Sequence, residues 1–203
     1  MAVSYHLNDL PADVVLGECV AIDTETMGLE LWRDRLCVVQ LSAGDGNAHL
    51  VHFRDRDYGA PNLRRLLLDG AVTKLFHYAR FDLAMLQRHF GVICQPVYCT
   101  KLASKLVRTN TDRHGLRDLC QDLLGVEMSK QQQTSDWGAE KLTPEQIAYA
   151  ASDVLHLHAL RRRLDSLLDR EGRRELAEAC FRFLPVRAAL DLAGWSEVDI
   201  FAH

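Results

Sequence analysis

The sequence predicts an α/β fold in which helices pack against a mixed β-sheet. Apolar runs with strand-like composition fill the first part of the chain, one short helical stretch separates two of them, and apolar residues spaced by three and four dominate the second half. With 203 residues and 48% hydrophobic content, the chain can bury one sizeable core but not two. We therefore expect a single domain over 1–203, with a C-terminal helix and tail (about 173–203) used in packing or oligomerisation.

Four apolar runs are expected to be strands. The runs at 18–23, 35–43 and 47–53 follow one another closely, and the turn sequence GDG at 44–46 separates the last two. Because tight turns join antiparallel strands, these three should form a β-meander. A further short strand is expected at 74–77.

The remaining apolar segments have the spacing of amphipathic helices. The clearest start is at Thr143, which can cap a helix, with Pro144 in the first turn and Gln146 at the capping-box position. The polar stretch at 127–142 is expected to be irregular. The expected helices are 62–68, 79–90 (ended by Gly91), 99–107, 115–125, 143–172 and 173–183.

Composition argues against several classes of protein. No run of 18 apolar residues occurs, so we expect no transmembrane helix and no membrane partner. The N-terminus lacks a basic segment followed by an apolar one, so we expect no signal peptide. Six cysteines without a CxxC pair are expected to be reduced core residues of a cytoplasmic protein. The net charge of −4 argues against holding long nucleic acid by charge alone.

The candidate chemistry begins at AIDTET, residues 21–26, where two acids follow an apolar run. Side chains alternate along a strand, so Asp23 and Glu25 should point to the same face. One interpretation is that both are exposed acids of an edge strand, with Thr24 turned inward. The other is that a divalent cation lies between them, because like charges repel and hard cations such as Mg²⁺ bind carboxylate oxygens.

Two further acids lie on expected helices. Asp82 lies early in the helix at 79–90, where an acid can simply favour the helix dipole. Tyr149 and Asp153 lie four residues apart in the helix at 143–172, so they share a face. They could be a solvent-exposed polar pair, but the apolar residues around them are a poor setting for an unpartnered acid.

One hypothesis accounts for these five residues together. Two divalent ions about 3.5–4 Å apart can clamp a phosphodiester and stabilise its attacking and leaving oxygens. Asp23 would bridge both ions, and Asp82 would help to hold one of them. Glu25 and Asp153 would complete the other site, where Tyr149 would orient the attacking water. The predicted cofactors are therefore two divalent ions, Mg²⁺ or Mn²⁺.

The segments DTETMGL, HYARFDL and YAASD, in this order, resemble the motifs of the DEDD superfamily of 3′→5′ exonucleases, in the subclass with Tyr before the last Asp. The intervening residues are similar to ribonuclease D, with Lys130, Trp137, Tyr149 and Asp153 in the spacing K-x6-W-x11-Y-x3-D. The resemblance covers roughly residues 15–165. It implies a ribonuclease H-like fold, a mixed sheet flanked by helices, and the metal roles given above.

Bacterial ribonuclease D carries helical nucleic-acid-binding domains after its catalytic domain, and the residues after 165 are too few for them. The single-domain length and the tail LAGWSEVDIFAH resemble the nanoRNase C branch, whose members clear very short RNAs, chiefly dinucleotides, and form octamers. This resemblance implies an exoribonuclease that releases 5′ mononucleotides and acts as a homo-oligomer. The tail residues Trp195, Ile200 and Phe201 could dock on their own domain, but the branch resemblance favours packing against another subunit.

The predicted substrate contacts lie near these motifs. Leu29 could wedge between two bases or simply cover the core, and Trp137 could stack on a base or pin its loop. A cation is expected on the 5′ phosphate, from Lys130, Arg113 or Arg108, or from a neighbouring subunit. The predicted substrate-binding residues are Thr24, Met27, Gly28, Leu29, His77, Lys130, Gln133, Ser135 and Trp137.

Two other functions remain as alternatives. The same chemistry could trim longer RNA 3′ ends or act on DNA, which an active site open to solvent would favour. A non-catalytic nucleic-acid-binding or assembly protein on the same fold would have lost a metal ligand, whereas all four acids and Tyr149 are present.

Overall fold

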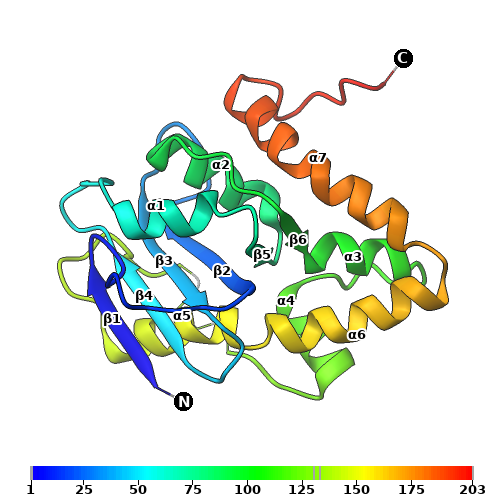
Figure 1. The fold of residues 1–203 in the computed structure, drawn as a ribbon, viewed down its shortest axis with the longest axis horizontal. Helices are drawn as coiled ribbons and strands as arrows, with labels where there is room; N and C mark the ends of the chain where they lie inside the picture. The colour runs from blue at the N-terminus through cyan, green and yellow to red at the C-terminus, as the bar shows by residue number, and fades with distance from the viewer. Residues whose placement is uncertain (1, 130, 133, 203) are drawn as a thin grey trace.

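A six-stranded mixed β-sheet forms the centre of the molecule (Figure 1). The computed structural model describes residues 2–129, 131–132 and 134–202. The strands are β1 (Val3–Leu7), β2 (Cys19–Thr26), β3 (Leu36–Ser42), β4 (Ala48–His52), β5 (Thr73–Phe76) and β6 (Val97–Cys99), in the order β1-β4-β3-β2-β5-β6. β2, β3 and β4 form the predicted antiparallel meander, while β1 pairs parallel with β4 and β5 pairs parallel with β2 and β6. The predicted α/β class is confirmed.

β2 carries the first two candidate metal ligands and lies inside the sheet, between β3 and β5. It extends past the predicted end at residue 23 to Thr26, so both acids belong to the strand. Its register places Asp23 opposite Gln40 and Glu25 opposite Val38. The interpretation of these acids as exposed residues of an edge strand is therefore wrong, because β2 lies inside the sheet and both acids are partly buried, although the pairing of β2 with β5 ends at Ala21.

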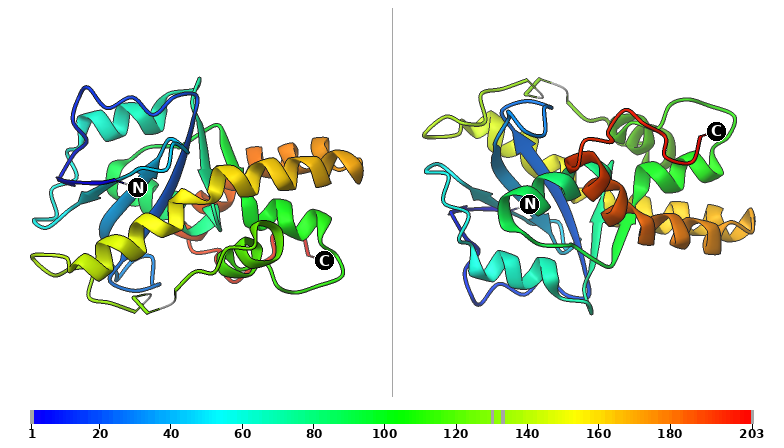
Figure 2. Two further views of the ribbon diagram at one scale, coloured as in Figure 1. Left: turned by 90° about the horizontal axis from the view of Figure 1, so that it is seen from below. Right: turned by 90° about the horizontal axis from the view of Figure 1, so that it is seen from above.

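Helices cover both faces of the sheet. They are α1 (Pro61–Leu68), α2 (Ala79–Phe90), α3 (Thr100–Val107), α4 (Leu116–Leu119), the π-helix η1 (Cys120–Leu124), α5 (Pro144–Leu155), α6 (Leu157–Arg170) and α7 (Arg174–Leu192). α5 packs on β2, β3 and β4, whereas α2 packs on β2, β5 and β6 from the opposite face (Figure 1). α3, α6 and α7 pack on one another and extend beyond the β6 side of the sheet (Figure 2). Among the described residues, no helix combines the length and apolarity needed to cross a membrane.

The helix predicted over 143–172 is in fact two helices, α5 and α6, because the chain bends at His156. Neither proline nor glycine marks this bend in the sequence. In the first turn of α6, the His158 ring lies 3.0 Å from the Cys19 carbonyl oxygen. Gly44 also approaches this ring so closely that a Cβ there would lie 2.7 Å from it. Contacts with distant parts of the chain thus fix a bend that helical periodicity does not reveal.

Other element boundaries also differ from the prediction. The helix expected over 173–183 continues to Leu192 as α7, through Pro185. The helix expected over 115–125 is one α-helical turn followed by the π-helix η1. Strands β1 and β6 are absent from the sequence prediction because β6 has three residues and β1 shows no regular alternation of burial.

A cluster of buried ion pairs, Arg80, Arg187 and Asp191, holds α7 to α2, and we call it the C-terminal latch. The Asp191 side chain is 4% exposed and accepts hydrogen bonds from Arg80 at 2.6 and 2.8 Å and from Arg187 at 2.8 Å. Both guanidinium groups also donate to the Ser196 carbonyl oxygen. The latch therefore ties the start of the tail to the helix that carries Asp82.

The tail after α7 docks through its main chain while its large apolar side chains stay exposed. Trp195, Val198, Ile200 and Phe201 are between 43% and 68% exposed. The sequence left two alternatives for this tail. Its backbone follows the docked alternative, and its side chains remain accessible to a partner.

Candidate active site

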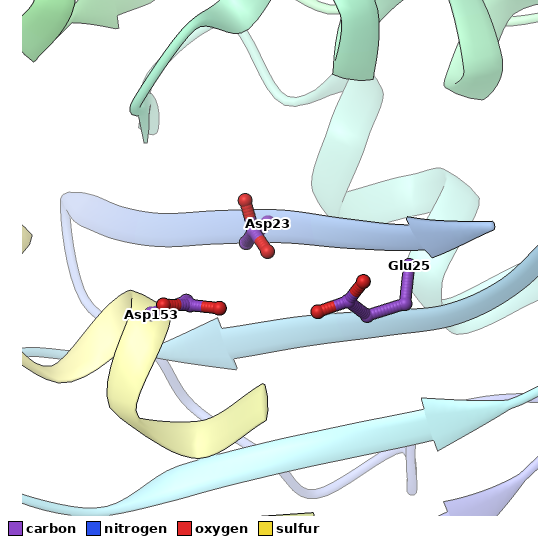
Figure 3. Close-up of side chains that lie close together, drawn as sticks. All are labelled: Asp23, Glu25 and Asp153. Carbon is purple, nitrogen blue, oxygen red and sulfur yellow. The ribbon is translucent and has the colours of Figure 1, made fainter. Parts of the chain in front are cut away.

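Three carboxylates from two elements meet on one side of the sheet (Figure 3). Asp23 and Glu25 leave the same face of β2, and Asp153 reaches them from the last turn of α5. One oxygen from each of the three lies within 4.8 Å of the others. The start of α5 is set by the predicted capping box, in which the Thr143 hydroxyl accepts from the Gln146 amide at 3.2 Å.

These carboxylates form no ion pair among the described residues, and they raise one another's pKa. Burial raises the pKa of Asp23 to about 7. Burial, and then the charges of Asp23, Asp153 and Asp82, raise the pKa of Glu25 well above its ordinary value. Burial followed by the charge of Asp23 does the same to the pKa of Asp82 and of Asp153. Full ionisation at neutral pH therefore requires a cation.

Asp82 belongs to the same cleft but not to the group of three. It lies in the first turn of α2, is 4% exposed, and its Oδ1 accepts a hydrogen bond from the Thr24 hydroxyl at 2.6 Å. Tyr78, directly before α2, has a φ of 65°, a left-handed conformation that is uncommon for a bulky residue. The hydroxyl bond orients Asp82, and Thr24 also lines the cleft, so the substrate contact predicted for it stays a prediction.

Gln40 is a site residue that the sequence reasoning missed. It is fully buried on β3, and its amide donates to Asp23 Oδ2 at 3.3 Å and to Glu25 Oε1 at 3.5 Å. A neutral donor can orient two carboxylates without neutralising them. The sequence signal was a lone glutamine in the apolar run CVVQLS, since a buried amide needs hydrogen-bond partners.

The group fits a hard divalent cation such as Mg²⁺ or Mn²⁺. Its ligand atoms are all carboxylate oxygens, the donors that these ions prefer. Asp23, Glu25 and Asp153 would hold one ion between them. Asp82, whose pKa is raised by burial and then by the charge of Asp23, is the predicted ligand of a second ion.

Tyr149 lies one turn before Asp153 on α5, as the spacing predicts, and lines the cleft. Burial, and then the charges of Asp153 and Glu25, raise the pKa of Tyr149, so its hydroxyl stays protonated at neutral pH. The Trp137 ring packs beside it with centroids 6.1 Å apart. Because Trp137 is 1% exposed, a base cannot stack on its face, and the structure favours the alternative that it pins its loop.

A cleft of about 620 Å³ opens over the carboxylates. Met27 and Leu29 line it and are 49% and 79% exposed. Between them, position 28 has room only for glycine, because a Cβ there would lie 2.3 Å from Oδ2 of Asp34. A leucine that inserts between two bases has to be exposed at the cleft, and Leu29 meets this requirement.

The start of α3 contributes another part of the cleft wall. His77 lines the cleft, and its Nδ1 lies 2.9 Å from the Thr100 hydroxyl, which donates to the Phe76 carbonyl at 3.2 Å. Burial first, and then Lys101, lower the pKa of His77 to about 3, so its ring is neutral. Sequence reasoning missed Lys101, whose Nζ lies 4.2 Å from the Tyr78 ring centroid and which supplies a cation to the cleft.

The polar loop before α5 carries three more of the predicted substrate contacts. Lys130 and Gln133 lie outside the described residues, so these predictions have no structural counterpart. Ser135 does line the cleft, and its hydroxyl donates to the Gln132 side chain.

The two arginines considered for the 5′ phosphate already have carboxylate partners. Arg108 pairs with Asp122, and Arg113 pairs with Asp118 at 3.1 Å and with Asp122 at 3.5 Å. Neither of them lines the cleft over the carboxylates, but Arg113 lines a neighbouring hollow that Tyr149 and Asp153 also line. Lys101 lines the cleft itself and is a further candidate for contact with a substrate phosphate.

Comparison with known proteins connects this geometry to a family. The family model described as 3′-5′ exonuclease matches residues 4–169. Ribonuclease D of Granulibacter bethesdensis is 38% identical over 154 residues, which cover 76% of this chain and 38% of that protein. Ribonuclease D of Acidiphilium cryptum is 35% identical over 154 residues, covering 76% and 39%. This chain thus spans about two fifths of the length of these curated relatives.

Solved structures extend the similarity over the whole chain. Brucella melitensis NrnC bound to pGG is 56% identical, with a TM-score of 0.97, covering 100% of this chain and 99% of that one. Brucella melitensis NrnC with bound Mg²⁺ is 55% identical, with a TM-score of 0.95 and 100% coverage of both chains. Escherichia coli RNase D, an exoribonuclease involved in structured RNA processing, is 25% identical with a TM-score of 0.73, covering 84% and 45%.

Proposed function

Because this chain belongs to the 3′-5′ exonuclease family, we propose that it hydrolyses very short RNA, chiefly diribonucleotides, from the 3′ end to 5′ mononucleotides. The predicted relationship to ribonuclease D and to the nanoRNase C branch is confirmed, and so is the DEDD exonuclease fold with its ribonuclease H-like sheet. The protein is a nuclease, and metal dependence follows from its fold. We propose two ions, Mg²⁺ or Mn²⁺, as its cofactors.

The similarity to NrnC is the main support for very short RNA as the substrate. NrnC, 56% identical over nearly the whole of both chains, was captured with pGG, a ligand of two nucleotides. The exposed Leu29 at the cleft supports the same class, because an apolar side chain inserted between two bases suits a substrate with few bases.

The carboxylates of Asp23, Glu25 and Asp153, with Asp82 beside them, would hold the cations at the cleft. When bound, the ions supply the positive charge that neutralises a phosphodiester and stabilises its oxygens during hydrolysis. The remaining catalytic contribution of the chain is to hold its own groups in place before the substrate arrives, so that little reorganisation is needed during the reaction.

Neighbouring polar side chains do this holding. Gln40 donates to Asp23 and Glu25, and Thr24 fixes the orientation of Asp82. The protonated hydroxyl of Tyr149 can both donate and accept, so it can orient a water molecule for in-line attack on the phosphorus. Hydrolysis of this kind requires no covalent protein nucleophile.

His77 and Lys101 would contact different parts of the substrate. Since the Thr100 hydroxyl donates to a carbonyl, His77 donates through Nδ1 and keeps Nε2 as an acceptor. An acceptor in the cleft suits a sugar hydroxyl of the substrate. Lys101, by contrast, carries the charge that suits a phosphate oxygen.

We further propose that the enzyme works in the cytoplasm as a homo-oligomer, an octamer as the branch resemblance implies. The exposed apolar tail side chains support assembly, because they would be covered by a second subunit. All six cysteines are free, which fits a reducing compartment.

The test uses two 5′-labelled RNAs, a dinucleotide and a seven-mer, each with Mg²⁺, Mn²⁺ or EDTA. Fast loss of the dinucleotide, slow attack on the seven-mer and inhibition of both by EDTA are expected. No hydrolysis of either RNA with either metal would contradict the proposal and favour a non-catalytic binding role.

A matched pair of variants separates the base wedge from general packing. Leu29→Ala should slow dinucleotide hydrolysis and reduce the preference over the seven-mer, because the wedge is lost. Leu68→Ala is the control, since Leu68 is 54% exposed on α1 and lies outside the cleft lining. Equal behaviour of the two variants would remove Leu29 from the substrate site.

Trimming of longer RNA is the second candidate function. Its support is the sequence identity with ribonuclease D proteins over 76% of this chain. Equal rates on the dinucleotide and the seven-mer would favour this function, with the same metal chemistry. Matched DNA oligonucleotides in the same assay would show whether the sugar is selected.

A further inference from the structure

A second hollow, of about 500 Å³, adjoins the cleft at Met27, which lines both. Four guanidinium groups line it, and we call it the arginine pocket (Arg33, Arg35, Arg56 and Arg88). The chain as a whole has a net charge of −4, so this concentration of cations is a local feature.

Arg33 is the one member of the arginine pocket with a carboxylate partner among the described residues, because it pairs with Asp34 at 2.8 Å. Arg35 donates to two backbone carbonyls at 2.8 and 3.1 Å, and Arg88 donates to three backbone carbonyls. Carbonyl oxygens hold a guanidinium in place but do not cancel its charge. Arg35 and Arg88 therefore present fixed positive charge without an ion-pair partner of their own among the described residues, although the Asp34 carboxylate acts on Arg88 as well as on Arg33.

Arg56 adds a third such charge from the loop after β4. It is exposed and makes no hydrogen bond or ion pair to the part of the chain that the structure describes. Asp136 is the one carboxylate in the lining, and its Oδ1 is already used by the Gly138 amide at 3.0 Å. The lining thus has an excess of positive charge.

Neutral groups complete the pocket. The Tyr58 and His89 rings, with centroids 4.4 Å apart, line it, and His89 Nε2 accepts from the Leu36 amide at 3.2 Å. That bond leaves a hydrogen on Nδ1 of the neutral ring as a donor. Burial, and then the charges of Arg88 and Arg35, lower the pKa of His89 to about 4, as expected beside cations.

Gly138 lines the arginine pocket close to Met27, the residue that the pocket shares with the cleft. A Cβ at this position would lie 2.4 Å from Met27 Sδ and 3.0 Å from a terminal nitrogen of Arg35. The missing side chain therefore lets the Arg35 guanidinium stand directly beside the residue that separates the pocket from the cleft.

We propose that the arginine pocket is a second binding site, for a phosphate-bearing anion no larger than a mononucleotide. Planar guanidinium groups offer paired donors that match phosphate oxygens, and a dianionic phosphate would balance most of the charge that the chain leaves unpaired. A volume near 500 Å³ lies in the range of small-ligand sites. The neighbouring cleft has the opposite sign, because its carboxylates repel the same anion when no cation is bound.

This difference in sign gives a direct test. The full chain is titrated by calorimetry in EDTA with inorganic pyrophosphate, a 5′ mononucleotide and the corresponding nucleoside. Saturable binding of pyrophosphate, with none of the nucleoside, is expected. Binding of the mononucleotide as well would assign the site to nucleotides, and binding of pyrophosphate alone would assign it to inorganic phosphates. No saturable binding of either phosphate compound would overturn the proposal.

A charge-matched pair of variants locates the binding. Arg56→Gln should weaken pyrophosphate binding roughly tenfold, because a charge-assisted contact is lost. Arg65→Gln, an exposed arginine on α1, should leave it unchanged. Both variants should hydrolyse RNA at the wild-type rate, which also reports that they fold. Equal loss of pyrophosphate binding in both variants would mean non-specific attraction and overturn the site.

The size of the assembly distinguishes an anion from another copy of the chain. If a neighbouring subunit's acids occupied the arginine pocket, Arg56→Gln would change the elution volume on a sizing column. We expect no change, and a shift would overturn the anion site in favour of a subunit interface.

Discussion

The molecule buries acidic side chains in two places, and the groups around them differ in charge. Asp191 in the C-terminal latch is surrounded by the guanidinium groups of Arg80 and Arg187. Asp23, Glu25 and Asp153 have no cationic partner in the part of the chain that the structure describes, and the side-chain donor to Asp23 and Glu25 is the neutral amide of Gln40. Since buried charge requires compensation, the first group is complete without a ligand and the second is not.

The charges around the two groups of acids thus distinguish the latch, a structural cluster, from the cleft, a binding site. In the latch, removal of Asp191 would leave two guanidinium groups without a carboxylate, whereas removal of either arginine would still leave an ion pair, so Asp191 is the residue that holds the cluster together. At the cleft, the compensation has to come from outside the chain. Perturbed carboxylates next to a hollow are a physical indicator of a functional site, and here the fold family agrees with it.

The largest expected effect is on catalysis. Asp153→Asn should reduce hydrolysis of a dinucleotide roughly 10³-fold or more, because it removes a cation ligand. Without added metal, the same variant should melt at a higher temperature than the wild type, because one repelling charge is gone. Asp13→Asn, at an exposed position, is the control. A near-normal rate for Asp153→Asn would remove Asp153 from the metal site.

Removal of the acid in the latch should lower the stability of the protein, whereas Asp153→Asn should raise it in the absence of metal. Asp191→Ala should lower the free energy of unfolding by about 2–3 kcal/mol, since it removes charge-assisted hydrogen bonds from two partly exposed guanidinium groups that keep their carbonyl acceptors. Denaturant unfolding measures this loss, and Glu178→Ala, at an exposed position of the same helix, provides the control. A loss below about 1 kcal/mol would place Asp191 with ordinary surface pairs.

The pH dependence of the metal-free protein sharpens the comparison. The raised pKa of Asp23, about 7 in the folded protein, means that the folded state binds more protons than the unfolded state between about pH 4 and 7. The stability of the metal-free protein should therefore fall as pH rises through this window, lowering the melting temperature by roughly 2–4 °C for each kcal/mol lost. Saturating Mg²⁺ should reverse the loss. A melting temperature that rises over this window without metal would contradict the assignment.

The smallest effect on stability is expected from the end of the tail. Truncation after Val198 keeps the main-chain contacts of the latch at Trp195 and Ser196 but removes Ile200 and Phe201. The unfolding free energy should change by no more than about 0.5 kcal/mol, as for other exposed sites. The elution volume on a sizing column should nevertheless change if these side chains pack against another subunit, and an unchanged volume would contradict that role.

Local patterns in the sequence determined most of the fold class and the acids of the site. Alternation along β2 placed Asp23 and Glu25 on one face, and the i, i+4 spacing on α5 placed Tyr149 beside Asp153. The capping box at Thr143 was readable because all its members lie within four consecutive positions. These features depend on neighbours in the chain, so one sequence is enough to recognise them.

Tertiary structure alone decided the features that depend on distant residues. Gln40 reaches the acids because β3 pairs with β2 in one particular register, and Lys101 enters the cleft because α3 begins beside α2. The bend at His156 follows from contacts that α6 makes elsewhere, and the latch joins Arg80 to Asp191 across most of the chain. Sequence periodicity reports which face of an element is buried, but not which other element covers it. For that reason the clustered acids of the candidate site could be predicted from the sequence, while the groups that orient and balance buried acids could not.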